Sequence, residues 1–326
     1  STMVQNMEGR IWGENVLSRP YPPEVAKIRS QHVCQSCGHV AMAWTGQCPD
    51  CREWNTLVEQ AAPKPVARPA SGKTGNGRNL TRGEPGKAVP LREVQATRVE
   101  RFSTGIGELD RVLGGGIVPG SLILLGGSPG IGKSTLTGMA MANLQAAGAE
   151  TLYVSGEESA AQVRMRAERL GPAALEVKAL AESSLETVLG TIEAERPAVC
   201  VIDSIQTMHS SELSGAPGSV GQVREAANAL AELAKRLDVA VILVGHVTKE
   251  GSLAGPRVLE HLVDCVLRFE GERERTWRTL RAIKNRFGAT SEVGVFEMRS
   301  GGLTEVLDAS ARFVEEATGA QGSVVL

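Results

Sequence analysis

Short, continuous apolar runs alternate with longer segments of helical periodicity through residues 121–245. The apolar runs predict strands at 121–126, 150–155, 175–179, 198–202 and 239–245. The periodic segments predict helices at 133–147, 158–170, 184–195 and 221–237. Apolar strands separated by helices indicate a mostly parallel sheet with helices on both faces, and therefore an α/β fold. Further runs at 263–269, 278–284 and 292–297 predict an antiparallel extension of that sheet.

A short helix is predicted before the first strand. Ser103 or Thr104 can cap its start, and the glycines from Gly114 to Gly116 end it. The strand and helix pattern then predicts one core domain over residues 96–310.

The remaining chain divides by composition. Residues 1–31 are polar and interrupted by prolines, which predicts an N-terminal extension. Residues 32–58 hold two CxxC pairs and predict a small metal-binding domain. Residues 59–95 are rich in Ala, Pro, Gly and basic side chains, which is typical of a flexible linker.

The first predicted strand leads into a glycine-rich loop. Residues Gly127 to Ser134 fit the pattern G-x-x-x-x-G-K-[ST] at every fixed position. Glycines let backbone N–H groups curl around phosphate oxygens, and the following helix directs its positive end at them. Lys133 can reach the outer phosphates of ATP or ADP, and the Ser134 hydroxyl can hold Mg²⁺. The predicted nucleotide-binding residues here are Gly127, Ser128, Pro129, Gly130, Ile131, Gly132, Lys133, Ser134 and Thr135. The alternative, a β–α turn without a ligand, leaves this lysine with nothing to bind.

Acidic side chains follow two other predicted strands. Asp203 ends the run AVCVIDS, where a carboxylate can bind Mg²⁺ through water; a helix-capping aspartate is the alternative. Glu157 and Glu158 follow the strand at 150–155, where one carboxylate can position the water that attacks ATP. We expect Glu157 to be the catalytic acid of the two. Alternatively, both acids favour the dipole of the next helix.

Other polar residues follow strands on the same edge. His246 follows the last central strand and can sense the terminal phosphate, although a locally bonded histidine is the alternative. The small-residue segments at 209–221 and 249–257 can move with nucleotide state and touch nucleic acid, or they are ordinary surface loops. Lys249 and Arg257 are the predicted DNA phosphate contacts. Because aromatic stacking partners are lacking, such binding would be salt-sensitive.

The motif KNRFG ends a predicted strand and places Lys284 and Arg286 on one face. If subunits form a ring, these cations can enter the nucleotide site of a neighbour. A trans-acting arginine finger contributes about 10³–10⁵ in rate. A pair of surface cations is the alternative.

Four cysteines cluster within the segment at 32–58. Cys34, Cys37, Cys48 and Cys51 form C-x₂-C, ten residues, C-x₂-C. Four thiolates in a tetrahedron select Zn²⁺ and leave no open position for catalysis. A structural zinc site is therefore predicted, with unbound thiols or an iron–sulfur cluster as alternatives.

The charge is distributed unevenly along the chain. The formal net charge of −2 is the sum of +4 over residues 1–100 and −6 over residues 101–326, so the basic part is separate from the core. No run reaches the roughly 18 apolar residues of a membrane helix, and the N-terminus has no apolar signal core. We therefore expect a cytoplasmic protein without a membrane partner.

A series of these motifs resembles the bacterial RadA (Sms) DNA-repair ATPases, in the same order and over about residues 30–310. The motifs are the four-cysteine segment, STGIGELDRVLGGG, GGSPGIGKST, YVSGEES, VIDSIQT, GHVTKEGSLAGPRVLEH and KNRFG. The resemblance implies a RecA-like P-loop ATPase core of the hexameric-helicase superfamily. It also implies DNA-dependent ATP hydrolysis by a homohexamer with single-stranded DNA in its channel, and branch migration of recombination intermediates beside the RecA recombinase.

The resemblance also implies residue roles. Lys133 and Ser134 would serve phosphate and Mg²⁺, and Asp203 would serve Mg²⁺. Glu157 would activate water, and Lys284 and Arg286 would act across subunits. The family carries a Lon-protease-like domain after the core, and residues 311–326 would be its beginning.

Two other functions are compatible with the same motifs. One is a nucleotide-gated interaction module that recruits a protein partner through its zinc domain and linker. The other is a small-molecule kinase, which is disfavoured because no lid or second-substrate pocket is evident and KNRFG would be unexplained. A response of ATP hydrolysis to single-stranded DNA distinguishes the motor from the module.

Overall fold

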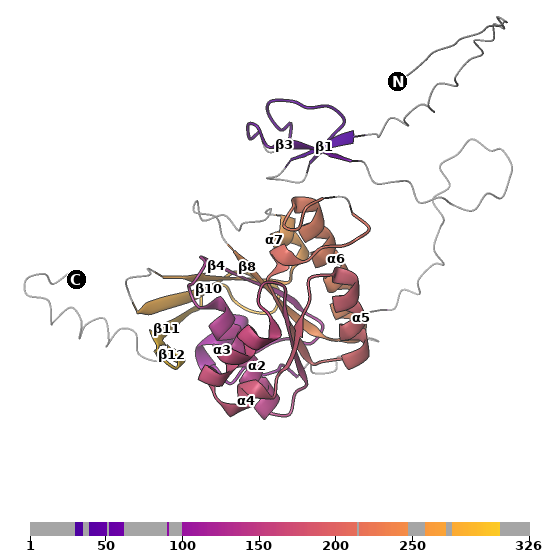
Figure 1. Cartoon of the computed structure of the whole chain (residues 1–326). Coiled ribbons are helices and arrows are strands. Elements are labelled where there is room, and N and C mark those ends of the chain that lie inside the picture. The colour runs from indigo at the N-terminus through magenta and orange to yellow at the C-terminus, as the bar shows by residue number, and fades with distance from the viewer. Residues whose placement is uncertain are drawn as a thin grey trace, which may run out of the picture.

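A computed structural model of the chain describes residues 30–34, 39–50, 52–61, 90, 100–213, 215–246, 258–271 and 276–306. The described residues form a small N-terminal sheet and a larger α/β core (Figure 1). Residues 1–29 of the predicted extension, most of the predicted linker and residues 311–326 lie outside them.

The N-terminal unit, which we call the cysteine module (residues 30–61), is a three-stranded antiparallel sheet. Its strands are β1 (Ser30–Cys34), β2 (Val40–Ala41) and β3 (Leu57–Ala61), in the order β2-β1-β3. Its buried apolar cluster consists of only Cys34, Cys48 and Leu57 among the described residues. So small a cluster contributes little apolar burial to folding.

The core is built on a nine-stranded sheet with the order β12-β11-β10-β9-β4-β8-β7-β5-β6. Its strands are β4 (Leu122–Gly127), β5 (Thr151–Ser155), β6 (Lys178–Ala181), β7 (Val199–Asp203), β8 (Ala240–His246), β9 (Cys265–Glu270), β10 (Trp277–Asn285), β11 (Val293–Arg299) and β12 (Gly302–Glu305). The strands from β9 to β6 in this order run parallel, and β10, β11 and β12 continue the sheet antiparallel.

Helices cover both faces of this sheet (Figure 1). On one face lie α1 (Gly107–Leu113), α2 (Lys133–Ala146), α3 (Ala160–Leu170) and α4 (Pro172–Leu175). On the other lie α5 (Leu185–Glu195), α6 (Val220–Leu237) and α7 (Val258–Leu262). Within β4, Ile123 and Leu125 join the first hydrophobic cluster while Leu122 and Leu124 join the second, which explains why this strand is apolar at every position.

The predicted mostly parallel α/β fold is confirmed, with three local corrections. The strand predicted at 175–179 begins later, because Pro172 starts the short helix α4 and the chain enters the sheet only at Lys178. The run at 263–269 was expected to be antiparallel, but β9 lies parallel to β4. It follows the helix α7, and a helical crossover returns the chain in the same direction.

The third correction concerns the start of α1. Neither Ser103 nor Thr104 caps this helix, whose N-cap is Ile106 without a side-chain bond. Both hydroxyls instead donate to the carboxylate of Asp110 at 2.7 Å. The predicted glycine stop is correct, since Gly114 adopts the left-handed conformation at the C-cap. Among the described helices, none is both long and apolar enough to span a membrane.

Candidate active site

Four neighbouring parallel strands end at the same edge of the sheet, and their ends bring the predicted site residues together. Gly127 at the end of β4 lies opposite His246 of β8, and Asp203 of β7 lies opposite Ser155 of β5. A cleft of about 560 Å³ opens at this edge. It is lined by Pro129, Gly130, Gly132, Lys133, Ser134, Thr135, Ser155, Glu157, Glu158, Arg166, Asp203, His246, Arg278 and Met298.

The loop between β4 and α2 needs its glycines for close approaches. A Cβ at Gly127 would lie 2.6 Å from the carbonyl oxygen of Phe269, and one at Gly132 would lie 2.6 Å from the methyl carbon of Met298. Gly132 also has φ +112°, a conformation that L side chains rarely adopt. The loop therefore fits tightly against β9 and β11 while it delivers the start of α2 to the cleft.

Lys133 is the first residue of α2, and its side chain is folded along the loop. Its Nζ donates to the carbonyl oxygens of Gly127 at 2.8 Å and Ser128 at 3.0 Å. Burial lowers the pKa of this ammonium, whereas the charges of Asp203 and Glu157 act to raise it. A buried ammonium beside a helix N-terminus provides fixed positive charge for phosphate oxygens.

His246 bridges the lysine and the acid. Its Nδ1 lies 3.4 Å from Lys133 Nζ, and its Nε2 lies 3.3 Å from Glu157 Oε1. Since a lysine ammonium only donates, Nδ1 accepts, and the proton on Nε2 points at the Glu157 carboxylate. His246, which we expect to sense the terminal phosphate, is thus in contact with both Lys133 and Glu157.

The two neighbouring glutamates face different partners. Glu157 Oε1 accepts from Ser204 Oγ at 2.6 Å, whereas Glu158 Oε2 pairs with Arg166 Nη1 at 2.7 Å. Burial raises the pKa of Glu157, but the hydrogen bonds from Ser204 and His246 and the charge of Lys133 outweigh it and hold that pKa below its usual value. Glu157 is therefore an ionised acceptor at neutral pH.

The donors at the cleft suit a hard divalent cation. Ser134, on the first turn of α2, and Asp203, at the end of β7, both line it. An alcohol and a carboxylate are oxygen ligands of the kind that Mg²⁺ prefers, with waters completing its octahedron. The residues present therefore fit Mg²⁺.

Lys284 and Arg286 lie near the opposite end of the sheet. Asn285 pairs with Cys265, which lies opposite Ile123 at the start of β4. The phosphate-binding loop follows Gly127, which is about 13 Å further along β4 at roughly 3.3 Å per residue. These two cations therefore lie away from the cleft of their own chain.

Both cations are held at the junction of α7 and β9. Lys284 Nζ donates to the carbonyl oxygens of Glu260 and Val263, each at 2.7 Å. Burial, followed by the charge of Arg286, lowers the pKa of Lys284. Arg286 Nη1 pairs with Asp264 Oδ1 at 2.9 Å, while its side chain remains 51% exposed. The guanidinium thus keeps a surface that another molecule can reach.

Two of the four predicted ligands lie in the described part of the cysteine module: Cys34 is the last residue of β1, and Cys48 directly precedes a turn at residues 49–50. Cys34 N donates to His39 O, and Cys48 N donates to Glu53 O, both at 2.9 Å. Both cysteines are buried. Buried thiols in a domain without a substantial core fit a structural metal site.

Some predicted residues lie outside the described part of the chain, namely Cys37, Cys51, Lys249 and Arg257.

The cleft also contains groups that the sequence analysis missed. Arg278 of β10 is 5% exposed and donates from Nε to Ile131 O at 3.2 Å, which ties the phosphate-binding loop to the sheet. Arg166 also lines the cleft, and it contacts Tyr153, which is buried behind the cleft. Arg278 occupies a buried position in the alternating pattern of β10, and Tyr153 lies within the buried strand β5; a polar group at such a position is the sequence feature that could have indicated each of them.

Two family models match this chain. One is described as an AAA domain and matches residues 88–252, about half of the chain. The other is described as a rubredoxin metal binding domain and matches residues 32–59, which include all four predicted metal ligands. The chain thus belongs to the AAA domain family and carries a P-loop ATPase core behind a metal-binding ribbon.

Curated relatives confirm the resemblance to the bacterial RadA proteins. The chain is 49% identical to the DNA repair protein RadA of Listeria monocytogenes and 47% identical to that of Bacillus subtilis, over 92% of its length in both cases. It is 50% identical to the RadA protein of Pseudomonas aeruginosa over 93% of its length. It spans only 64% to 65% of the length of these relatives.

A solved structure supports the fold. A chain whose title describes it as an ATPase domain matches with a TM-score of 0.54 at 14% sequence identity, over 64% of this chain and 92% of that one. The expected RecA-like α/β architecture is consequently confirmed.

Proposed function

We propose that this chain is the motor portion of a DNA-repair ATPase, which hydrolyses ATP in the cleft at the strand ends. The observation that carries the proposal is the convergence of Lys133, His246, Asp203 and Glu157 from four strands on one cleft. The phosphate-binding loop from Gly127 to Thr135 would hold the nucleotide, and Ser134 and Asp203 would hold Mg²⁺. That ion would neutralise charge on the phosphates when bound.

In this proposal Glu157, and not Glu158, orients the attacking water. Its carboxylate is ionised and connects through His246 to Lys133. Glu158 is occupied by Arg166. Glu157→Gln should lower turnover by about 10²–10⁴-fold while nucleotide binding persists. Glu158→Gln is the matched control, and an equal loss in that variant would contradict the assignment.

Lys284 and Arg286 would complete the cleft of a neighbouring subunit. Their distance from the cleft of their own chain supports action on a neighbour and fits a homohexameric ring. Arg286→Ala should keep ATP binding, lose turnover, and poison activity when mixed with wild type. Arg281→Ala, on the strand β10 that precedes Arg286, is the control. Full turnover by the Arg286 variant would remove the trans role.

We further infer that the ring translocates on single-stranded DNA and drives branch migration of branched recombination intermediates beside the RecA recombinase. The RadA relatives are titled DNA repair proteins, which supports DNA as the polymer. Lys249 and Arg257 would contact its phosphates. Four thiolates, from Cys34, Cys37, Cys48 and Cys51, would hold Zn²⁺ in the module. The cytoplasm remains the expected compartment.

The deciding experiment measures ATP hydrolysis with and without single-stranded DNA across a salt series. We expect DNA to stimulate turnover at low salt and the stimulation to fade as salt rises, because phosphate contacts release counterions. Basal turnover should change little over the same series. A rate that ignores DNA at every ionic strength would exclude the motor.

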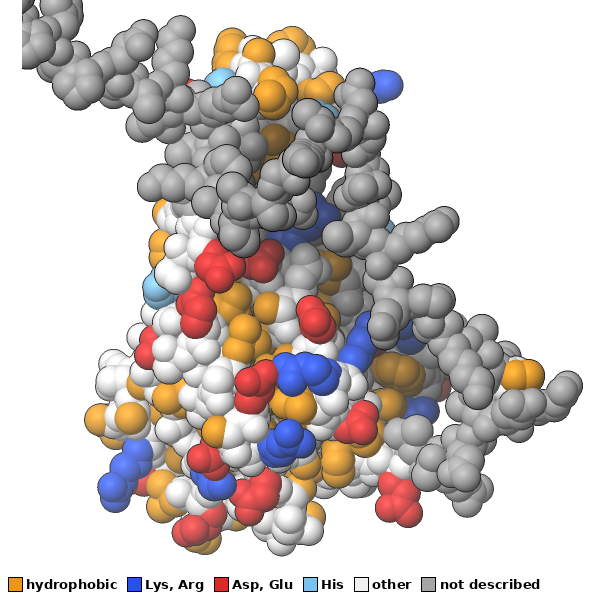
Figure 2. Space-filling model, turned by 90° about the vertical axis from the view of Figure 1, so that its right-hand side faces the viewer, with side chains coloured by type: hydrophobic (Ala, Val, Ile, Leu, Met, Phe, Trp, Pro, Cys, Tyr) orange, Lys and Arg blue, Asp and Glu red, His pale blue; other side chains and the backbone are white. Residues whose placement is uncertain are grey.

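A second candidate, the nucleotide-gated interaction module, is favoured by one surface. The cysteine module exposes Met42 (89%), Trp44 (58%) and Trp54 (69%), and hydrophobic side chains gather at that end in Figure 2. Exposed apolar groups of this kind mark sites of protein contact. DNA-insensitive ATP turnover together with nucleotide-dependent binding of a protein partner would select this function.

A further inference from the structure

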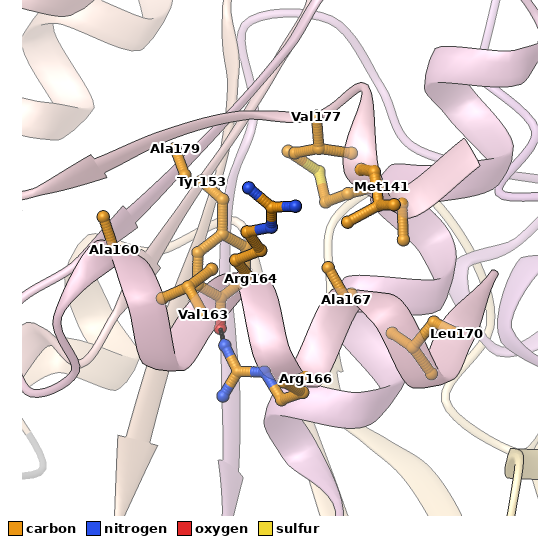
Figure 3. Close-up of a pocket in the computed structure, with 13 residues that line it drawn as sticks. Met141, Tyr153, Ala160, Val163, Arg164, Arg166, Ala167, Leu170, Val177 and Ala179 are labelled. Atoms are coloured by element: carbon orange, nitrogen blue, oxygen red, sulfur yellow. Dashed lines mark hydrogen bonds between the residues drawn. The ribbon is translucent and has the colours of Figure 1, made fainter. Parts of the chain in front are cut away.

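Behind the cleft, a buried tyrosine contacts the carboxylate that fits Mg²⁺. Tyr153 lies on β5 and is 3% exposed, and its hydroxyl donates to Asp203 Oδ2. The same hydroxyl receives a hydrogen bond from Arg166 Nη2 at 2.9 Å (Figure 3). The tyrosine therefore stands between a cation of α3 and the acid at the end of β7.

The direction of these bonds is fixed by their chemistry. An arginine guanidinium has five N–H donors and no acceptor, so the phenol oxygen must accept from Arg166. The single phenolic proton is then directed at Asp203 Oδ2. A phenol has an ordinary pKa of about 10 and keeps this proton at neutral pH.

The arrangement is held from both sides. Arg166 is anchored by its ion pair with Glu158 at 2.7 Å, and its guanidinium carbon lies 5.2 Å from the centre of the Tyr153 ring. The ring belongs to the first hydrophobic cluster, against which Val163 of α3 packs, and it also lines a cavity of about 380 Å³ beside Ala167 (Figure 3). The phenol is thus held in place as the partner of Asp203 by a cation on one side and apolar packing on the other.

We propose that Tyr153 is a positioning residue for the Mg²⁺ of the cleft. By occupying Oδ2, it fixes the rotation of the Asp203 carboxylate and leaves Oδ1 to the metal or its bound water. Arg166 orients the phenol and so acts one contact further out. This inference rests on the proposed function only in so far as the cleft holds a nucleotide with Mg²⁺.

The test compares ADP affinity with excess Mg²⁺ and with EDTA, using a fluorescent ADP and the full chain. Tyr153→Phe should leave the affinity in EDTA within about twofold. In wild type, Mg²⁺ should raise the affinity for ADP over its value in EDTA. In Tyr153→Phe this increase should be about tenfold smaller, as expected for loss of one hydrogen bond to a charged group. Mn²⁺ titration followed by electron paramagnetic resonance should show the same tenfold weakening of the ion in the ADP-loaded protein.

Two further variants make the result specific. Val163→Ala removes two methyl groups from the lining of the same cavity but keeps the phenol, so its response to Mg²⁺ should match wild type. Arg166→Met should also weaken the effect of Mg²⁺ on ADP affinity. It replaces Tyr153→Phe as the test if the Tyr153 variant does not fold. An unchanged Mg²⁺ response in Tyr153→Phe, or an equal loss in Val163→Ala, would overturn the proposal. Wild type that binds no ADP at all would instead reject the proposed function.

Discussion

The cysteine module and the ATPase core achieve order by different means. The core buries two large hydrophobic clusters, one on each face of its sheet. The buried cluster in the described part of the module has three side chains, of which two are cysteines. Burial of apolar surface contributes about 25 cal/mol per Å², which can stabilise the core. The module buries too little apolar area for the same contribution to stabilise it. We therefore expect the fold of the module to depend on a bound metal ion and the fold of the core to depend on apolar burial.

Removal of the metal should have the largest effect, because we expect it to unfold the module and leave the core folded. A zinc chelator, or Cys48→Ser, should unfold the module, because such sites contribute about 10–16 kcal/mol of apparent binding energy. The core should keep its structure. Indole N–H signals in NMR spectra can follow both at once, since Trp44 and Trp54 belong to the module and Trp277 to the core. A module that stays folded without metal would end the comparison.

The next effect addresses the core alone. Phe269 and Phe296 are buried and meet edge to face with ring centres 5.9 Å apart. Phe269→Ala should cost about 3–5 kcal/mol of unfolding free energy, measured by urea denaturation through the Trp277 indole N–H signal. The Trp44 and Trp54 indole signals should not move. A loss below about 1 kcal/mol would mean that the stability of the core does not depend on this cluster.

A third prediction concerns activity. Lys133→Ala should reduce ATP turnover by at least about 10²–10³-fold, because it removes a fixed positive donor from the cleft. Lys178→Ala removes a half-exposed lysine elsewhere in the core and should change turnover little. Cys48→Ser should leave basal turnover near that of wild type. Equal losses in the Lys133 and Cys48 variants would show that the module is part of the catalytic unit.

The smallest effect is a graded response of the core to acid. Hydrogen bonds from its own backbone N–H and from the Ser210 hydroxyl lower the pKa of Glu186 to about 2. A depressed pKa contributes stability that is fully present above the usual glutamate pKa of 4.5, and that contribution is lost as the pH falls toward 2. The gap in melting temperature between wild type and Glu186→Gln should therefore close over this range. Because the carboxylate is exposed and screened by solvent, the gap is modest.

The module should respond to acid differently from the core. Protons compete with the metal for thiolates, so its unfolding should be abrupt and should coincide with zinc release. A zinc-sensitive dye added during the same acid titration measures that release. Gradual loss of the module without zinc release would contradict this expectation.

Much of the core follows from its sequence pattern, because apolar strands and loop glycines are each typical of one local structure. The run from Leu122 to Leu125 predicts a strand buried on both faces, and the loop ending at Lys133 predicts the start of α2; both are found. The direction of β9 could not be predicted, since parallel and antiparallel strands have the same local composition when they are buried. It depends on the crossover through α7.

The site residues at the ends of strands could be predicted from the sequence. The residues that contact them from inside the core could not. Asp203, Glu157 and His246 follow strands, so the topology brings them together. Tyr153 sits inside an apolar strand and is typical of core, although it bonds to a residue 50 positions further along the chain. Arg166 lies on a helix whose spacing does not indicate either partner. Contacts between such distant elements leave no periodic pattern in the sequence.

The separation between the cleft and the KNRFG loop has a geometric consequence. A head-to-tail contact would place the inserting group of one copy at the receiving site of the next. If Arg286 serves a neighbour in this way, one site stays unfilled until the series closes on itself or extends as a filament. The rotation that relates one copy to the next would then determine how many copies form a closed ring.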